Sequence, residues 1–167
     1  MKKFTILNRE SARKIIREDV DNSSNQQMPD QQSSETTDTQ KSGIVQFFSK
    51  LFESREMAHI YHLQVKGEEG SFAKHKALGE YYEGVVGLID DIIEIYMGQY
   101  DVIEGYDSID TTPTRSVDPI EYFNGIASYI KSERSKCISS EDTHLLNIVD
   151  EIQSLIYKLL YKLKYNK

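Results

Sequence analysis

Apolar residues recur at every third or fourth position in four stretches of the chain, at about residues 44–65, 72–99, 118–136 and 141–165. This spacing is typical of one buried face of an α-helix. The positions that we expect to form the core are Ile44, Phe47, Phe48, Leu51, Ala58, Tyr61, Leu78, Tyr82, Val85, Ile89, Ile92, Tyr96, Leu145, Ile148, Val149, Ile152, Ile156, Leu159, Leu160 and Leu163. The pattern therefore predicts an all-α fold built from four helices.

The connections between these helices differ in length. The first and last are short and contain Gly or Ser, whereas residues 99–117 lose the helical period and contain Gly, Pro, Asp and Thr. Short links make neighbouring helices antiparallel. A link of about 19 residues extends to about 60 Å, which exceeds the length of a helix of about 40 Å. We therefore expect a ferritin-like four-helix bundle with a long crossover between helices two and three; an up-and-down bundle with one long loop is the alternative.

The N-terminal part, residues 1–42, is predicted to be a flexible leader before a domain at residues 43–167. Its first 18 residues are basic and include a short helix-prone peptide, and the rest is acidic and polar with few large apolar side chains. A basic peptide on a tether is suited to docking on a protein partner; a frayed tail without a partner is the alternative. The triplet Ile16-Arg17-Glu18 also resembles sites cut by the head proteases of tailed phages, which would remove the leader.

Charge and cysteine content narrow the classes of function. The net charge of the 167 residues is −7 at pH 7, and an acidic folded part makes DNA binding weak or absent. Cys137 is the single cysteine, which excludes an internal disulfide and fits a reducing, cytoplasmic compartment. No apolar run is long enough to span a membrane, and the N-terminus lacks the apolar core of a signal peptide.

One polar stripe on the second predicted helix carries candidate metal ligands. At 100° per residue, its members fall within about a third of the helix circumference: His75, Glu83, Asp90 and Glu94. On the first helix, His62 lies in line with the apolar residues and His59 lies beside it, one turn earlier. Imidazole and carboxylate groups from two helices suit a borderline metal ion such as iron, whereas an ordinary solvated stripe is the alternative.

These residues also carry a family resemblance. The run His62-Leu63-Gln64-Val65-Lys66-Gly67, followed by Phe72-x-x-His75, Tyr82, Asp90 and Glu94, resembles the core of Dps proteins, the ferritin-superfamily cages that oxidise iron and protect DNA. The resemblance implies a homo-oligomer of at least two chains with an iron site between subunits. His62 and His75 would come from one chain and Asp90 and Glu94 from the other, with His59 and Glu83 as additional candidates.

The sequence departs from the family pattern at two positions. Gly79 stands where the family has an acid, and Leu63 stands where it has a tryptophan. Glu80 or Glu83 are the nearest substitutes for the acid, although each is turned away from it by about 40° or more. A sibling arrangement with Glu-x-x-His pairs inside the bundle is an alternative, at Glu56-x-x-His59 and Glu141-x-x-His144.

Two functions of different classes follow from these patterns. The first is a Dps-like protein that binds ferrous iron, with weak ferroxidase activity as the enzymatic form. The second is a non-catalytic structural or interaction module that oligomerises through the bundle and docks a partner through residues 1–18. The chain also resembles small Dps-like proteins of tailed bacteriophages, which implies the cytoplasm of a bacterial host or the virion as its location.

Overall fold

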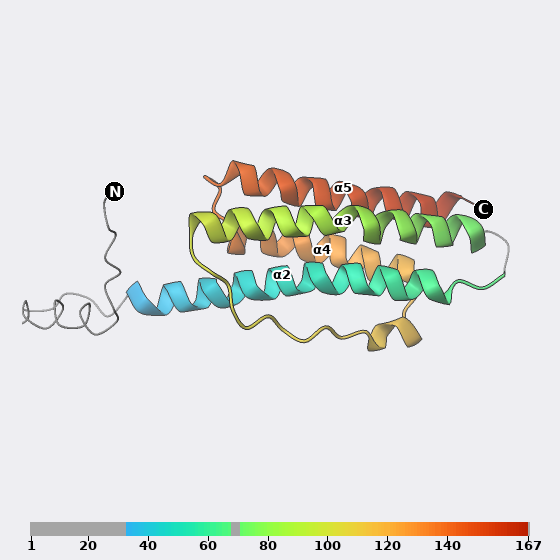
Figure 1. Cartoon of the computed structure of the whole chain (residues 1–167), viewed down its shortest axis with the longest axis horizontal. Helices are drawn as coiled ribbons and strands as arrows, with labels where there is room; N and C mark the ends of the chain where they lie inside the picture. Colours follow the sequence, from blue (N-terminus) through green and yellow to red (C-terminus); the bar gives the residue numbers. More distant parts are fainter. Residues whose placement is uncertain (1–32, 68–70, 167) are drawn as a thin grey trace, which may run out of the picture. The chain divides into compact units, whose positions relative to one another are not determined.

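The computed structural model describes residues 33–67 and 71–166, with side chains from residue 43 onward. Its elements are α2 (Ser33–Gln64), α3 (Ser71–Gln99), the short 3-10 helix η1 (Thr112–Arg115), α4 (Pro119–Cys137) and α5 (Thr143–Tyr165) (Figure 1). No strand occurs in this part of the chain, and none of these helices is long and apolar enough to cross a lipid bilayer. The prediction of an all-α fold with four long helices is confirmed.

Helix α2 begins earlier than the sequence pattern predicts. It starts at Ser33, so residues 33–42, which we assigned to the flexible leader, continue the helix instead. Each residue added to an existing helix gains a backbone hydrogen bond, so a helix nucleated by an apolar stretch extends into polar sequence. The rest of the leader, including the basic peptide, its docking role and the cleavage triplet Ile16-Arg17-Glu18, lies outside the described residues.

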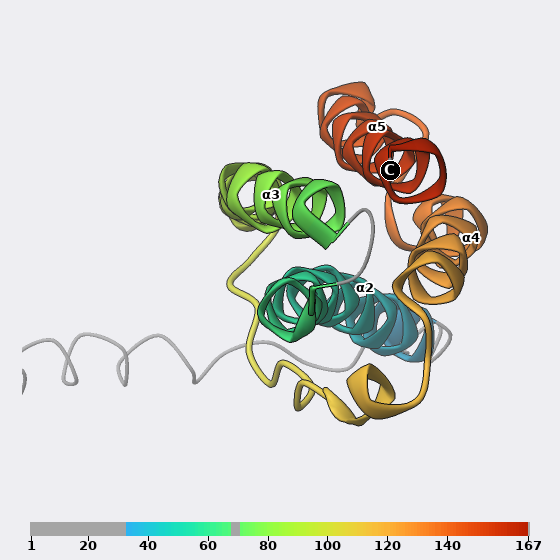
Figure 2. The ribbon, with the colours of Figure 1, turned by 90° about the vertical axis from the view of Figure 1, so that its right-hand side faces the viewer.

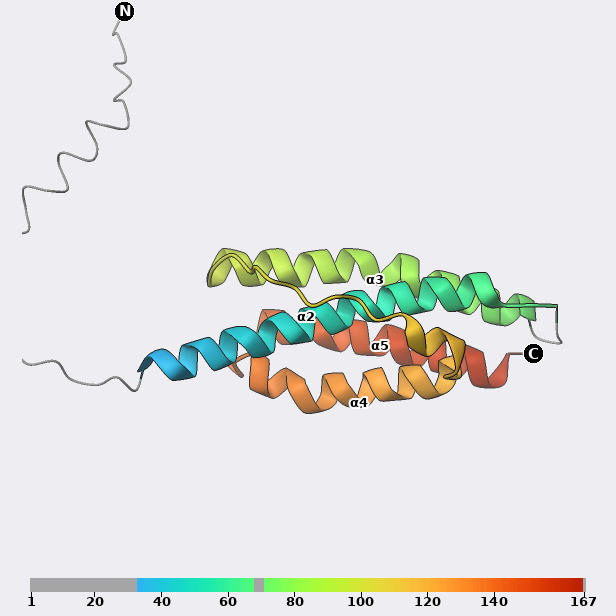
Figure 3. The ribbon, with the colours of Figure 1, turned by 90° about the horizontal axis from the view of Figure 1, so that it is seen from below.

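The four helices pack as a square. Helix α2 packs against α3 and α4, and α5 packs against the same two helices, so α2 and α5 occupy diagonal corners (Figure 2). Helices α3 and α4 run in the same direction, and α2 and α5 run opposite to them (Figures 1 and 3). Each helix therefore has antiparallel neighbours on two sides.

The parallel course of α3 and α4 depends on the long connection over residues 100–118, which passes along α2 from one end of the bundle to the other (Figure 3). Hydrogen bonds fasten it to α2 at two points. The backbone N–H of Asp107 donates to Ser49 Oγ at 2.9 Å, and the Tyr61 hydroxyl donates to the carbonyl oxygen of Val117 at 2.9 Å. This crossover is therefore a fixed part of the fold.

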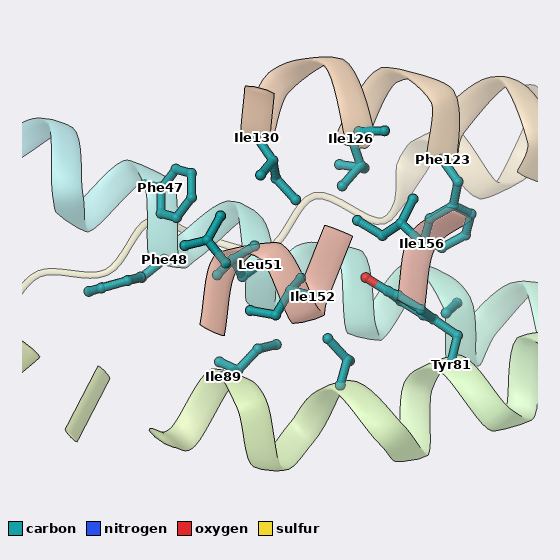
Figure 4. Close-up of a cluster of buried hydrophobic side chains, with 14 of the residues drawn as sticks. Phe47, Phe48, Leu51, Tyr81, Ile89, Phe123, Ile126, Ile130, Ile152 and Ile156 are labelled. Atoms are coloured by element: carbon teal, nitrogen blue, oxygen red, sulfur yellow. The ribbon is translucent and has the colours of Figure 1, made fainter. Parts of the chain in front are cut away.

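The core is formed by apolar side chains from all four helices (Figure 4). Nearly all predicted core positions are buried, and only Tyr82, Tyr96 and Ile148 are partly exposed. Tyr81 adds a polar contact inside this core. The Ser54 hydroxyl donates to the carbonyl oxygen of Leu51 at 2.7 Å, so the hydrogen bond of 2.9 Å between Ser54 and Tyr81 must be donated by Tyr81. Burial raises the pKa of Tyr81 above its ordinary value, which keeps the hydroxyl a donor.

A short local motif sets the start of α4. Asp118 is the N-cap residue, and its carboxylate accepts a hydrogen bond of 2.8 Å from the backbone N–H of Ile120. Pro119 occupies the first helical position, where a missing N–H breaks no helical hydrogen bond. This cap fixes where the crossover ends and the second half of the bundle begins.

Candidate metal centre

Two histidines face each other where α2 ends and α3 begins. His62 lies in the last turn of α2, and His75 lies near the start of α3. Their rings are stacked, with centroids 3.6 Å apart and planes 26° from parallel. His62 is half-buried and His75 is exposed, so the pair is open to solvent on one side. The structure therefore brings together the two imidazoles that the sequence placed in one site.

Reciprocal hydrogen bonds fix the orientation of both rings. Nδ1 of His62 lies 2.8 Å from the carbonyl oxygen of His75, and Nδ1 of His75 lies 3.1 Å from the carbonyl oxygen of His62. A carbonyl oxygen only accepts hydrogen bonds, so each Nδ1 carries the proton and donates. In the neutral ring the lone pair is then on Nε2. A backbone carbonyl holding one ring nitrogen while the other is left for a ligand is the usual arrangement of metal-binding histidines.

Gly79 explains how the His62 ring fits against α3. A Cβ atom placed on Gly79 would lie 3.3 Å from both Cε1 and Nδ1 of His62, which is tighter than ordinary van der Waals contact. The glycine thus allows the ring to lie directly on the α3 backbone. An acid at this position, as the family resemblance implies, would require the ring to move. The glycine that removes one expected ligand is therefore also the residue that makes room for the His62 ring.

His59 and Glu83, the additional candidates, connect to the pair through Tyr82. The Tyr82 ring lies 4.6 Å from the His59 ring and meets the His62 ring edge-on at 5.3 Å. Its hydroxyl lies 3.3 Å from a carboxylate oxygen of Glu83 and donates to it. Desolvation, followed by the charge of Glu83, raises the pKa of Tyr82. Glu83 is thus the acceptor for a tyrosine, and His59 packs beside the pair.

Sequence reasoning placed Tyr82 in the core, and the structure places it at the edge of the site. Consecutive residues of a helix are about 100° apart. The helical period therefore gives only the approximate face of a side chain, and it cannot separate a core tyrosine from one at the boundary of the core. The useful signal was the position of Tyr82, which lies one turn after Gly79 and seven residues after His75 and hence on nearly the same face.

Asp90 and Glu94 are not brought to the histidines within one chain. Both are exposed on α3, one turn apart. Asp90 follows His75 by 15 residues, which corresponds to about 22 Å along the helix. No group of three or more His, Cys, Asp or Glu residues able to hold a metal occurs among the residues that the structure describes. A site with all four ligands therefore requires a second copy of the chain.

The Glu141-x-x-His144 pair does not project into the bundle. Glu141 and His144 are both exposed, and Glu141 precedes α5. His144 Nε2 donates to the side-chain oxygen of Gln99 at 2.8 Å. In the other pair, Glu56 is bonded to Arg55 and His59 contacts Tyr82. The two pairs are not joined in one site.

Comparison with known proteins gives a family without an assigned activity. No curated protein and no solved structure matches the chain. The family model described as "Family of unknown function (DUF5856)" matches residues 62–163, a span that contains the histidine pair, Asp90 and Glu94. Because this match covers more than half of the sequence, the chain belongs to the DUF5856 family.

Proposed function

We propose that two copies of this chain bind ferrous iron between them, as a Dps-like protein with a ferritin-like bundle. His62 and His75 of one copy provide nitrogen ligands, and Asp90 and Glu94 of the partner subunit provide oxygen ligands. Two imidazoles and two carboxylates form a mixed donor set of the kind that ferrous iron accepts. Iron is here the cargo of the protein, and its oxidation in air is a further step that the experiment below measures separately.

The observation that carries the proposal is the reciprocal hydrogen bonding of the histidine pair. Both Nδ1 atoms donate to backbone carbonyls, which leaves Nε2 of each ring as the free acceptor. These hydrogen bonds hold both rings in place, and the same tautomer is the one usually found in histidines that bind a metal through Nε2. Each imidazole therefore keeps one nitrogen that can bind a metal ion, which supports the proposal.

The carboxylate side is supported by the exposure of Asp90 and Glu94. Neither side chain makes a hydrogen bond or an ion pair with any other described residue, and their pairing with a cation would relieve the repulsion between two acids one helical turn apart. If two α3 helices pack antiparallel about a two-fold axis near Glu83, the acids of one helix lie opposite the histidines of the other. The exposed Val86 and Gly87 lie on the same stripe and allow close approach.

The ferritin-like classification is supported by topology. The links before α3 and before α5 are short, the link before α4 is long, and α3 and α4 run parallel (Figure 1). This short–long–short order with one crossover is the arrangement of ferritin-type bundles. Fold alone does not establish an activity, so the iron proposal depends on the donor atoms and not on the topology.

A complementation experiment tests whether the site is shared between two chains. One variant lacks the nitrogen ligands (His62→Ala/His75→Ala), and the other lacks the oxygen ligands (Asp90→Ala/Glu94→Ala). Each homodimer should lose ferrous iron binding, measured without oxygen against a competing chelator. A heterodimer purified through two different tags keeps one intact pair of ligand sets, so it should bind half as much iron as the wild type.

The heterodimer also separates the proposal from its competitors. If the ligands belonged to one chain, mixing the variants would restore nothing. If the histidines and carboxylates had no role, the homodimeric variants would bind as the wild type does. Admitting air to the same samples and following ferric absorbance shows whether bound iron is oxidised faster than in buffer. If bound iron is oxidised no faster than in buffer, the ferroxidase hypothesis is wrong and the iron-binding proposal still stands.

A further inference from the structure

The outer face of α5 exposes three tyrosines that the core does not use. Tyr157, Tyr161 and Tyr165 have 53%, 61% and 69% of their surface exposed, and they follow one another at four-residue spacing. The rings of Tyr161 and Tyr165 contact each other, with centroids 5.4 Å apart. A shallow groove of about 370 Å³ lies beside them, lined by Ser154, Tyr157, Lys158, Tyr161 and Lys162. Contiguous exposed aromatic surface of this kind marks an interaction site.

Charge along this face is divided between the two halves of the helix. The first half carries Asp150 and Glu151, whereas residues 154–166 contain three lysines and no acid. Lys162 is paired with Glu80 of α3. Lys158 and Glu151 form no ion pair with other described residues. A helix that is acidic in its first half and basic in its second is complementary to a second copy of itself in the antiparallel direction.

Helix geometry defines the register of such a pair. If Ser154 faces the partner at a two-fold axis, Glu151 and Lys158 lie about 60° and 40° to one side, and Asp150 and Tyr157 lie to the other. The two-fold axis keeps each side together, so Glu151 of one helix meets Lys158 of the other with an axial offset of about 1.5 Å. The small Ser154 at the centre lets the two helices approach.

The hydrogen bonds of Tyr157 and Asp150 fit the same register. The side-chain nitrogen of Gln153 lies 3.1 Å from the Tyr157 hydroxyl and donates to it, so the proton of the hydroxyl has no acceptor among the described residues. Asp150 is bonded to Arg134, yet its side chain remains 58% exposed. In the antiparallel pair, Tyr157 of one copy lies beside Asp150 of the other and can donate to its carboxylate.

From these observations we infer that the outer face of α5 is an interface between two copies of this chain, arranged antiparallel about a two-fold axis at Ser154. A single-stranded nucleic acid is the other partner that lysines and exposed tyrosines fit. It would place phosphates along a face whose first half carries Asp150 and Glu151, whereas a second copy uses both halves. This surface shares no residue with the proposed iron site, so a chain with both interfaces assembles beyond a dimer.

Charge reversal in the full-length protein tests the inference by sedimentation equilibrium over a range of protein concentrations. Glu151→Lys and Lys158→Glu should each weaken self-association through α5 by about tenfold or more, since each creates two like-charge contacts across the two-fold axis. The double variant E151K/K158E should restore the wild-type association. Lys131→Glu makes the same charge change on the exposed face of α4 and should leave the association unaltered.

The outcomes separate this interface from the proposed iron site. If the single variants associate as the wild type does, or if the double variant fails to restore association, the α5 interface is wrong, and iron binding by the heterodimer above is unaffected. A wild-type protein that binds a fluorescent single-stranded oligonucleotide, with the binding lost in Lys158→Glu and no self-association through α5, would also overturn it. Circular dichroism of each variant confirms that the helices are intact.

Discussion

At its first turns α3 is held to α2 by His62 and His75, and at its last turn it is held to the start of α5 by Gln99 and Tyr100. At the second end, Gln99 Nε2 donates to Asp142 Oδ1 at 2.6 Å, and the Tyr100 hydroxyl donates to the other carboxylate oxygen. Both ends thus join neighbouring helices through side-chain hydrogen bonds. The two ends differ in whether all of their hydrogen-bonding side-chain atoms have partners within the protein.

Asp142 is buried, with 5% of its surface exposed, and both of its carboxylate oxygens accept hydrogen bonds. The bond from Tyr100, followed by that from Gln99, holds the pKa of Asp142 below its ordinary value, and the same bond raises the pKa of Tyr100 to about 12. The histidine end instead leaves Nε2 of both rings as acceptors. A contact whose polar groups all have hydrogen-bond partners within the protein stabilises the fold. A contact that leaves nitrogen lone pairs unused is able to bind a ligand such as a metal ion.

The largest effect on stability is expected from Asp142→Ala. It leaves the Gln99 amide and the Tyr100 hydroxyl without their acceptor, so the free energy of unfolding should fall by about 3 kcal/mol. Urea denaturation measures the change, and Asp91→Ala, an exposed acid on α3, is the matched control with an expected change within about 0.5 kcal/mol. Iron binding by the folded variant should be unaltered. A loss no larger than that of the control would show that the Asp142 end is not a structural lock.

At the histidine end, removing one ring should change binding more than stability. His75→Ala deletes one proposed iron ligand and the partner of the His62 ring, so ferrous iron affinity should fall by about 100-fold, or about 2.7 kcal/mol. The free energy of unfolding should change by less than about 1 kcal/mol, because His75 is exposed. Chelator competition and urea denaturation on the same preparation measure both. Equal losses of iron-binding free energy and unfolding free energy would show that the histidine end, like the Asp142 end, mainly stabilises the fold.

Lowering the pH should destabilise the contact between Asp142, Gln99 and Tyr100, because the pKa of Asp142 is lowered in the folded state. A carboxylate with a folded-state pKa below its unfolded value of about 3.9 contributes stability above that value and loses it as the pH falls toward the folded-state pKa. The wild type should therefore lose up to about 1 kcal/mol more than Asp142→Asn when the pH is lowered from about 5 to about 3. Urea midpoints at each pH measure the difference. Parallel curves for the two proteins would remove Asp142 from the acid response.

The two ends were not equally predictable from the sequence. The buried positions of α2, α3 and α5 depend on local spacing, so the sequence predicted them well. The carboxylate of Asp142, in contrast, accepts hydrogen bonds from Gln99 and Tyr100, more than 40 residues away. No local pattern contains a contact of that separation.

At the histidine end the sequence predicted which imidazoles meet but not how they are held. The resemblance to Dps proteins implied that His62 and His75 of one chain belong to the same site, across a short turn. The reciprocal bonds to backbone carbonyls depend on the path of the turn itself, which helical periodicity does not describe. The proposed meeting of Asp90 and Glu94 with these rings involves a second chain, and a single helix pattern gives only the stripe on which the partner would lie.

The smallest effect and the finest test of the histidine end is expected from Gly79→Ala. Replacing glycine by alanine within a helix stabilises it by about 0.5 to 1 kcal/mol, and Gly125→Ala on α4, where a Cβ meets nothing within 4 Å, should show that full gain. At Gly79 the new methyl group lies 3.3 Å from the His62 ring, so the ring must shift by a few tenths of an ångström and the gain should be largely cancelled. Because the shift also moves Nε2, iron affinity should fall several-fold in Gly79→Ala and stay constant in Gly125→Ala. If both variants show the same gain in unfolding free energy and the same iron affinity, Gly79 does not hold the His62 ring in place. The stacked pair would then be a loose surface contact without a defined geometry for a metal ion.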